Sequence, residues 1–142
     1  MKLEIKFDDK KVMAKLRNLE KTTPKKIDTA IAKTATFAIN IIQQNIDRGQ
    51  GISGPFKPYS ESYAKFRADK GRQVSPVDLT FTGKMRAAMA HRALGTGRQR
   101  LYFLDALSSK KAFHNNKTRP FFGFNSQDRS RLTEFFRRNL QL

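Results

Sequence analysis

The chain has 142 residues, a mass of 16.3 kDa and no Cys, so it suits a single domain over residues 1–142 and excludes a disulfide framework, a thiolate nucleophile and a cysteine metal site. Its 29 Lys and Arg against 12 Asp and Glu give a formal net charge of +17, which favours a polyanion or an acidic protein surface as partner. Apolar runs are too short for a membrane span and the charged start is unlike a signal peptide, so we expect a soluble protein made inside the cell.

The first part of the chain predicts a strand and two helices. Residues 1–7 alternate apolar and charged side chains, which is typical of a half-buried strand at the edge of a sheet. A short helix is expected over residues 8–19, where apolar positions recur at helical spacing. Thr23 as cap and Pro24 as first residue then predict a second helix, over residues 24–48.

The helix over residues 24–48 has the clearest periodicity in the sequence. The positions that repeat at steps of three and four residues are Ile27, Ile31, Thr34, Ala38, Ile41, Ile42 and Asn45. We therefore predict that Ile31, Ala38 and Ile42 are buried and that this helix is the spine against which the other elements pack. Gly49 follows, and glycine commonly ends a helix.

The middle of the chain predicts loops around a short helix. Residues 49–58 contain three Gly and two Pro, which predicts an irregular loop. A short helix can begin at Ser60, with Tyr63 and Phe66 spaced to meet on one face. After a basic loop, residues 79–82 predict a short extended run.

A third helix, a hairpin and a loop are expected next. Thr82 and Gly83 can cap the third helix. Two β-prone runs, residues 91–94 and 98–104, are separated by a Gly-Thr-Gly turn and predict a hairpin. The polar stretch over residues 105–119 predicts a loop.

The end of the chain predicts an aromatic plug and a last helix. Residues 120–124 form a compact aromatic run, and we expect Phe121 or Phe122 to be buried in the core. Asn125 or Ser126 can cap a final helix. Its apolar stripe is Leu132, Phe135, Phe136 and Leu140. The order of elements predicts an α+β fold, in which a long N-terminal helix packs against a small antiparallel sheet and a C-terminal helix follows.

The sequence contains no recognisable catalytic or metal-binding constellation. His91 and His114 stand 23 residues apart, without a spacing that pre-arranges a metal site. Neither a nucleophile elbow nor a complete phosphate-binding loop occurs, and the acidic residues are scattered singly among basic ones. We therefore expect no enzymatic activity, no metal and no cofactor.

Almost half of the net positive charge lies between residues 79 and 119, which hold nine basic residues against the single acid Asp105. Because a hairpin and a loop can protrude, we expect this stretch to contact a neighbouring subunit or a polyanion backbone. The candidate contact residues are Arg92, Arg98, Arg100, Lys110, Lys111, Lys117 and Arg119. Few aromatic side chains interleave with them, so any DNA contact should be electrostatic and indifferent to sequence.

Three segments stand out as motifs. They are Gly54–Ser60 (GPFKPYS), Leu79–Arg86 (LTFTGKMR), and Ala112–Asn115 (AFHN) with Arg119–Asn125 (RPFFGFN) and Asp128-Arg129 after it. Prolines restrict the first segment, a Thr-Gly cap opens the second, and Phe rings can seal the core in the third. The motif positions with an expected structural role are Gly54, Pro55, Phe56, Pro58, Tyr59, Thr82, Gly83, His114, Arg119, Pro120, Phe121, Phe122 and Gly123.

In order and spacing these segments resemble one family, the virion-morphogenesis and tail-completion (neck) proteins of Mu-like and related tailed bacteriophages. The sequence departs from the family pattern at Ser53, where the pattern has its leading Gly, and at Asn115-Asn116, where it often has a Gly. The resemblance implies a structural virion protein of the phage neck, assembled in the bacterial host cytoplasm. Such a protein joins the DNA-filled head to the tail or completes the tail end.

A neck role also implies partners. One chain of this size cannot surround a DNA duplex, so the role requires a closed ring of copies with heterologous contacts between subunits. The resemblance implies a hexamer or a dodecamer. The resemblance further implies connector, tail-tube or terminator proteins as neighbours, genomic double-stranded DNA in the lumen, and no membrane. We favour protein contact over lumen lining for the basic residues, because Arg suits bidentate pairing with carboxylates.

Two other hypotheses stay open at the level of sequence. The charge would also suit a free DNA-binding protein that is indifferent to sequence. A basic RNase with His91 and His114 as acid and base is the third possibility.

Overall fold

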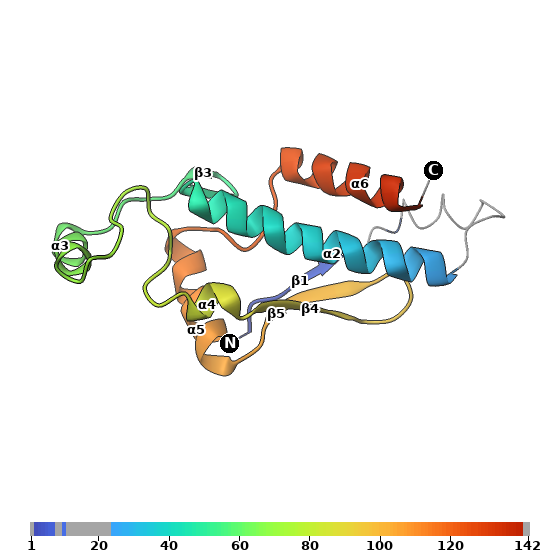
Figure 1. The fold of residues 1–142 in the computed structure, drawn as a ribbon, viewed down its shortest axis with the longest axis horizontal. Helices are drawn as coiled ribbons and strands as arrows, with labels where there is room; N and C mark the ends of the chain where they lie inside the picture. The colour runs from blue at the N-terminus through green and yellow to red at the C-terminus, as the bar shows by residue number, and fades with distance from the viewer. Residues whose placement is uncertain (1, 8–9, 11–23, 141–142) are drawn as a thin grey trace.

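The computed structural model describes residues 2–7, 10 and 24–140. They form the predicted α+β fold, in which one long helix lies between a sheet and a second helix (Figure 1). The elements are β1 (Ile5–Phe7), α2 (Pro24–Asp47), β2 (Gln50–Gly51), β3 (Gly54–Pro55), α3 (Glu61–Asp69), α4 (Lys84–Ala87), β4 (Met89–Ala93), β5 (Gln99–Phe103), α5 (Ala106–Thr118) and α6 (Ser126–Leu140). Apart from residue 10, the helix expected over residues 8–19 lies outside the described residues, as does the Thr23 cap.

Helix α2 begins and ends within one residue of the prediction and is the spine of the fold. Ala38 and Ile42 are fully buried, as predicted, whereas Ile31 is only half-buried. The buried face consists of Ile27, Ala30, Thr34, Ala35, Ala38, Ile41, Ile42 and Ile46. Gly49 follows the helix with a φ of +66°, a left-handed conformation that favours glycine. A Cβ atom there would lie 2.7 Å from the Cβ of Pro76.

A three-stranded antiparallel sheet with the order β1–β5–β4 packs against α2. Strands β4 and β5 form the predicted hairpin, and β1 is an edge strand, as predicted. In β5, Leu101 and Phe103 are buried, whereas Arg100 and Tyr102 lie half-exposed on the other face. Leu101 and Phe103 join the α2 side chains in one core.

Helix α6 packs along the side of α2 that faces away from the sheet (Figure 1). Asn125 caps it, because its side-chain oxygen accepts a 2.7 Å hydrogen bond from the backbone N–H of Asp128. The buried residues of the predicted stripe are Leu132, Phe136 and Leu140. Phe135 is half-buried and stacks on Phe37 of α2, with 4.3 Å between ring centroids.

The segment after the hairpin corrects the prediction, because residues 106–118 form helix α5 rather than a polar loop. Asp105 caps this helix by accepting a 2.7 Å hydrogen bond from the backbone N–H of Ser108. The buried face consists of Ser108, Ser109 and Ala112. Small and polar side chains make no apolar stripe, so hydrophobic periodicity does not reveal the helix.

Two shorter segments also differ from the prediction. Residues 49–58, expected as an irregular loop, contain the small β2–β3 hairpin, and the Phe56 N–H donates to the Gly49 carbonyl at 2.8 Å. Residues 79–82 form no strand, and Leu79 has a φ of +50°, which interrupts an extended run. The third predicted helix is the single turn α4.

Residues 57–83 form an arm that carries α3 away from the rest of the fold (Figure 1). Helix α3 begins directly after Ser60, which confirms the predicted start, and the Ser60 side chain caps it. The rings of Tyr63 and Phe66 stack with 6.0 Å between centroids, and their side chains are 40% and 46% exposed. The arm therefore presents aromatic surface outside the main core.

Candidate functional site

The arm is held together by one buried arginine, Arg67, which is 1% exposed. Its Nε donates to the Gln73 carbonyl at 2.7 Å, and its Nη2 donates to the Thr80 carbonyl at 2.7 Å. Nη2 also pairs with Asp78 Oδ1 at 3.0 Å, and the guanidinium carbon lies 4.6 Å from the centroid of the Tyr59 ring. These partners come from both sides of α3, so Arg67 ties the outgoing and returning segments of the arm together.

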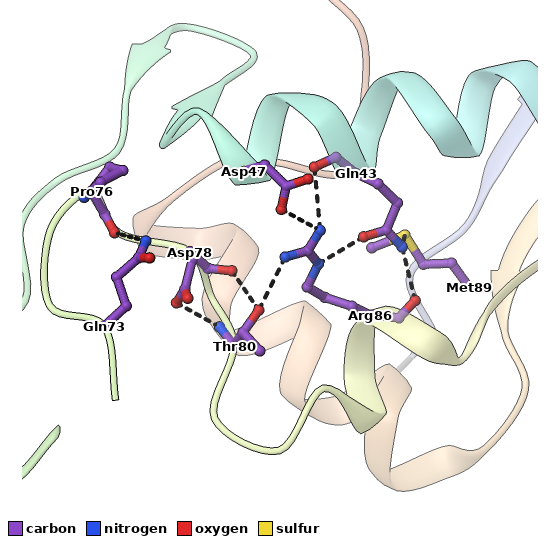
Figure 2. Close-up of polar contacts among 8 residues, drawn as sticks. All are labelled: Gln43, Asp47, Gln73, Pro76, Asp78, Thr80, Arg86 and Met89. Atoms are coloured by element: carbon purple, nitrogen blue, oxygen red, sulfur yellow. Dashed lines mark hydrogen bonds and ion pairs between the residues drawn. The ribbon is translucent and has the colours of Figure 1, made fainter. Parts of the chain in front are cut away.

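A second arginine, Arg86 of α4, fastens the base of the arm to α2 (Figure 2). Its Nε donates to Gln43 Oε1 at 2.7 Å, and its Nη2 pairs with Asp47 Oδ1 at 2.7 Å. Its Nη1 donates to Thr80 Oγ1 at 3.2 Å. Thr80 in turn donates its N–H to the Asp78 carboxylate and its hydroxyl to the Asp78 carbonyl. Arg86 therefore links α2 to the returning segment of the arm.

A third arginine, Arg119, fastens the outgoing segment of the arm. Its Nε donates to the Lys57 carbonyl at 2.6 Å and its Nη2 to the Pro58 carbonyl at 2.8 Å. Its guanidinium carbon also lies 4.9 Å from the centroid of the Tyr59 ring. Burial raises the pKa of the Tyr59 phenol above its ordinary 10.0, although the charge of Arg67 acts in the opposite direction.

The aromatic run of the third motif is held by Asn116 of α5. The Asn116 side-chain oxygen accepts hydrogen bonds from the backbone N–H groups of Phe121 at 2.9 Å and Phe122 at 3.0 Å. Both rings are buried, which confirms the prediction that at least one would be. The Phe122 ring lies 4.9 Å from that of Phe103 in β5. Asn116 thus directs the chain from α5 into the core.

The three motif segments meet at one groove between the arm and helices α4 and α5. The groove has a volume of about 850 Å³. Its cationic lining residues are Lys57, Arg67, Arg86, Lys111 and Arg119. None of the described residues that line it is acidic. Asp78 and Asp47 pair with two of the arginines. Among the described residues, Lys57, Lys111 and Arg119 form no ion pair with a carboxylate, and Lys111 acts on Asp105 only at longer range.

The structure divides the predicted contact residues between the hairpin and α5. Arg92 and Arg98 are exposed on the hairpin, whereas Arg100 is half-buried and pairs with Glu4 of the N-terminal segment at 3.0 Å. The candidates on α5, which are Lys110, Lys111 and Lys117, are all exposed. Only Lys111 and Arg119 of the seven candidates line the groove, while Arg92 and Arg100 line a second hollow of about 390 Å³.

The remaining motif residues have structural environments. Phe56 is buried. Gly54 and Gly83 have φ values of +125° and +83°, which favour glycine. The Lys84 N–H donates to Thr82 Oγ1 at 3.4 Å, and the Ile52 N–H donates to the Pro120 carbonyl at 2.9 Å. Gly123 lies so close to the Ile52 side chain that a Cβ atom would not fit there. Pro55 lies in β3, and Pro58 and Thr82 line the groove.

The two histidines lie on different elements with different partners. His91 of β4 bonds Thr36 Oγ1 at 2.9 Å and Gln99 Oε1 at 3.0 Å. His114 is exposed on α5, edge-on to the ring of Phe113. Within residues 2–7, 10 and 24–140, no three His, Asp or Glu side chains gather as a metal ion would require.

Two arginines that support the groove were not predicted as site residues. Nothing in the sequence distinguishes Arg67 from its exposed neighbours Lys65 and Lys70, because its partners are brought to it by the fold of the arm. Arg86 is the last residue of the second motif, Leu79–Arg86, and its place in this motif is the one sequence signal that could have predicted it as a site residue.

In the part of the chain that the structure describes, no helix combines the length and hydropathy needed to cross a membrane. Compared with known proteins, the chain matches no family model, no curated protein and no solved structure. Its role is therefore inferred from its own residues, their motifs and the geometry of the groove.

Proposed function

We propose that the chain is a structural subunit of the tailed-phage neck, which assembles into a ring that joins head to tail or completes the tail end. The observation that carries the proposal is that the motif segments Gly54–Ser60 and Leu79–Arg86 converge at one groove with Asn115 and Arg119 of the third motif. Segments that lie about 60 residues apart in the chain form one structural unit there. The motif residues that resemble neck proteins therefore contribute to one site and are not three separate turns, and this supports the resemblance.

Exposed apolar side chains support an assembly role. A ring closes through contacts between two different faces of neighbouring subunits. The chain exposes Tyr63 and Phe66 on the arm, and separately Leu104 and Leu107 where β5 leads into α5. In the proposed ring the arm of one subunit contacts the next subunit, and the basic hairpin meets an adjacent protein or the DNA.

The experiment is to look for the chain in particles and for rings of the isolated protein. Mass spectrometry of purified virions should detect it, and light scattering with negative-stain imaging should show closed oligomers. Tyr63→Ser with Phe66→Ser should weaken ring formation, whereas Ser62→Ala on the exposed surface of the same helix should not. Completed particles that lack the chain would refute the proposal.

A free DNA-binding protein is the second candidate, favoured by the net charge of +17. Such a protein should bind duplex DNA as a monomer or dimer, with an affinity that falls steeply as salt rises. An unassembled neck subunit should bind duplex weakly. Titration of a labelled duplex with the isolated protein at low and near-physiological salt distinguishes the two.

A further inference from the structure

We propose that the groove between the arm and helices α4 and α5 binds an acidic, extended segment of a different protein. This partner assignment rests on the proposed function in one respect, because an assembly subunit must contact other proteins. Its chemistry comes from the charge, the apolar lining and the aromatic packing of the groove itself.

The charge of the groove favours carboxylates. Lys57 and Lys111 are exposed at its wall and form no ion pair with the described acidic residues, although the charge of Lys111 acts on the Asp105 carboxylate at longer range. Arg119 directs Nε and Nη2 at backbone carbonyls, so no carboxylate among the described residues neutralises its positive charge. Carboxylates spaced along a strand could reach these cations in turn, and hydrogen bonds between charged groups are the stronger kind.

The size and apolar lining of the groove favour a short extended peptide. A volume of about 850 Å³ falls in the range of ligand pockets and suits a few residues rather than a folded surface. Leu79 and Met85 are buried side chains that also line the groove, and Phe81 lies beside them in the lining. An apolar side chain between the carboxylates of the partner would pack on this surface.

The aromatic rings disfavour a nucleic acid as the occupant. Stacking of bases requires open ring faces. The Tyr59 ring already makes cation–π contacts with the guanidinium groups of Arg67 and Arg119. Phe81 stacks on Phe66 with 5.8 Å between centroids and 7° between ring planes, and Arg72 lies 5.2 Å from the Phe81 centroid. The rings of Tyr59 and Phe81 therefore already pack on other rings and on cations.

A second copy of this chain is also a poor occupant, because it has little acidic surface to offer. The chain has only 12 acidic residues, against 29 Lys and Arg residues. Acidic side chains that bond within the fold are Glu4, Asp28, Asp47, Asp78, Asp105, Asp128 and Glu134. The acidic segment is therefore expected from another protein.

The test uses the full chain and a fluorescein-labelled peptide in which Asp alternates with Leu and Ser, titrated by fluorescence anisotropy at near-physiological salt. The double variant Lys57→Glu with Lys111→Glu reverses two positive charges in the lining of the groove. Lys65→Glu with Lys110→Glu makes the same charge change at exposed lysines outside it. We expect the groove pair to weaken binding by about tenfold or more and the control pair by less than about threefold. Circular dichroism verifies that both variants are folded.

A second readout locates the bound peptide. In protein labelled with ¹³C at the methionine methyl groups, the resonance of Met85, which lines the groove, should shift on peptide addition. The resonance of Met89, which is buried in the core and does not line the groove, should stay in place. The peptide with Asn in place of Asp should produce neither binding nor shift.

Three results would overturn the proposal. Equal losses in the two charge variants would mean general electrostatic attraction, and binding without a Met85 shift would place the peptide elsewhere. A single-stranded or duplex oligonucleotide that binds more tightly than the peptide, with the same loss in the groove variant, would make the groove a nucleic-acid site. None of these results bears on whether the chain is present in virions, so failure of this proposal is distinguishable from failure of the neck role.

Discussion

At the residue scale, Arg67, Arg119 and Asn116 each bind two backbone groups of a segment that lacks regular structure. Buried backbone N–H and C=O groups need partners, and a hydrogen bond to a charged donor contributes about 1.5–3 kcal/mol net. These side chains therefore hold the arm and the turn after α5 where helices and sheets supply few backbone hydrogen bonds.

Replacing Arg67 with Ala should loosen the arm specifically. The change leaves Asp78 and two backbone carbonyls without their partner, and breaking a buried pair in this way costs about 3–5 kcal/mol. Native-state hydrogen exchange should show faster exchange of the α3 amides. Arg72→Ala, an exposed cation on the same arm, is the control. Unchanged protection of α3 in the Arg67 variant would contradict the role assigned to this side chain.

Replacing Asn116 with Ala should destabilise the whole fold by roughly 1–3 kcal/mol, because two backbone N–H groups lose their acceptor. Asn116→Asp keeps an acceptor oxygen and should recover most of the loss. Chemical denaturation of the three proteins measures the free energy of unfolding. If the Ala and Asp variants are equally destabilised, the acceptor oxygen is not what matters at this position.

At the element scale, α2 provides the apolar face that both the sheet and α6 cover. Ile42 is fully buried in the larger of the two core clusters. Ile42→Asp should therefore cost about 4 kcal/mol or more, because it places a charge in the core without a partner. Thermal unfolding measures the loss. Asn40→Asp, exposed on the same helix, should change stability by less than about 0.5 kcal/mol.

The N-terminus of α5 makes a prediction about pH. Hydrogen bonds from the backbone and side chain of Ser108 hold the pKa of Asp105 below its ordinary 3.8. A carboxylate with a lowered folded-state pKa stabilises the fold above its unfolded pKa, and this contribution is lost as pH falls through the folded value. Asp105→Ala should thus lower the Tm at neutral pH, and the difference from the native protein should shrink on acidification to about pH 2. A difference that is constant with pH would mean that the carboxylate charge plays no part.

At the scale of the whole molecule, the protein combines a layered body with a projecting arm, and its exposed cations lie on both (Figure 1). Arg100 is unsuitable for a test of surface charge, because its pair with Glu4 connects β5 to the N-terminal segment. Arg92 and Arg98 are exposed on the hairpin and are the better choice.

Arg92→Ser with Arg98→Ser should reduce the yield of completed particles several-fold and leave the Tm of the isolated protein nearly unchanged. The physical reason is that paired charges at subunit junctions set register and the rate of encounter more than they stabilise the subunit. Arg129→Ser with Arg137→Ser removes the same charge from exposed positions of α6 and serves as the control. Normal infectious yield from the hairpin variant would show that this surface has no role in assembly.

The sequence by itself determined the elements whose signals are local. Helix α2, the hairpin and helix α6 were predicted because helical spacing, strand alternation, caps and turn residues all lie within a few positions of one another. The burial of Phe121 and Phe122 was also predicted from a local signal. Residues 120–124 contain three Phe, and so many apolar rings in a short segment favour a position in the core.

Only the tertiary structure decided α5, the arm and the groove. Helix α5 buries small and polar side chains that carry no hydrophobic period. Arg67 is buried, while its basic neighbours are exposed, because the arm folds the carbonyls of Gln73 and Thr80 back onto it. Arg119 reaches Lys57 across about 60 residues of chain. Such contacts depend on which segments the fold brings together, and no local pattern of residues encodes that proximity.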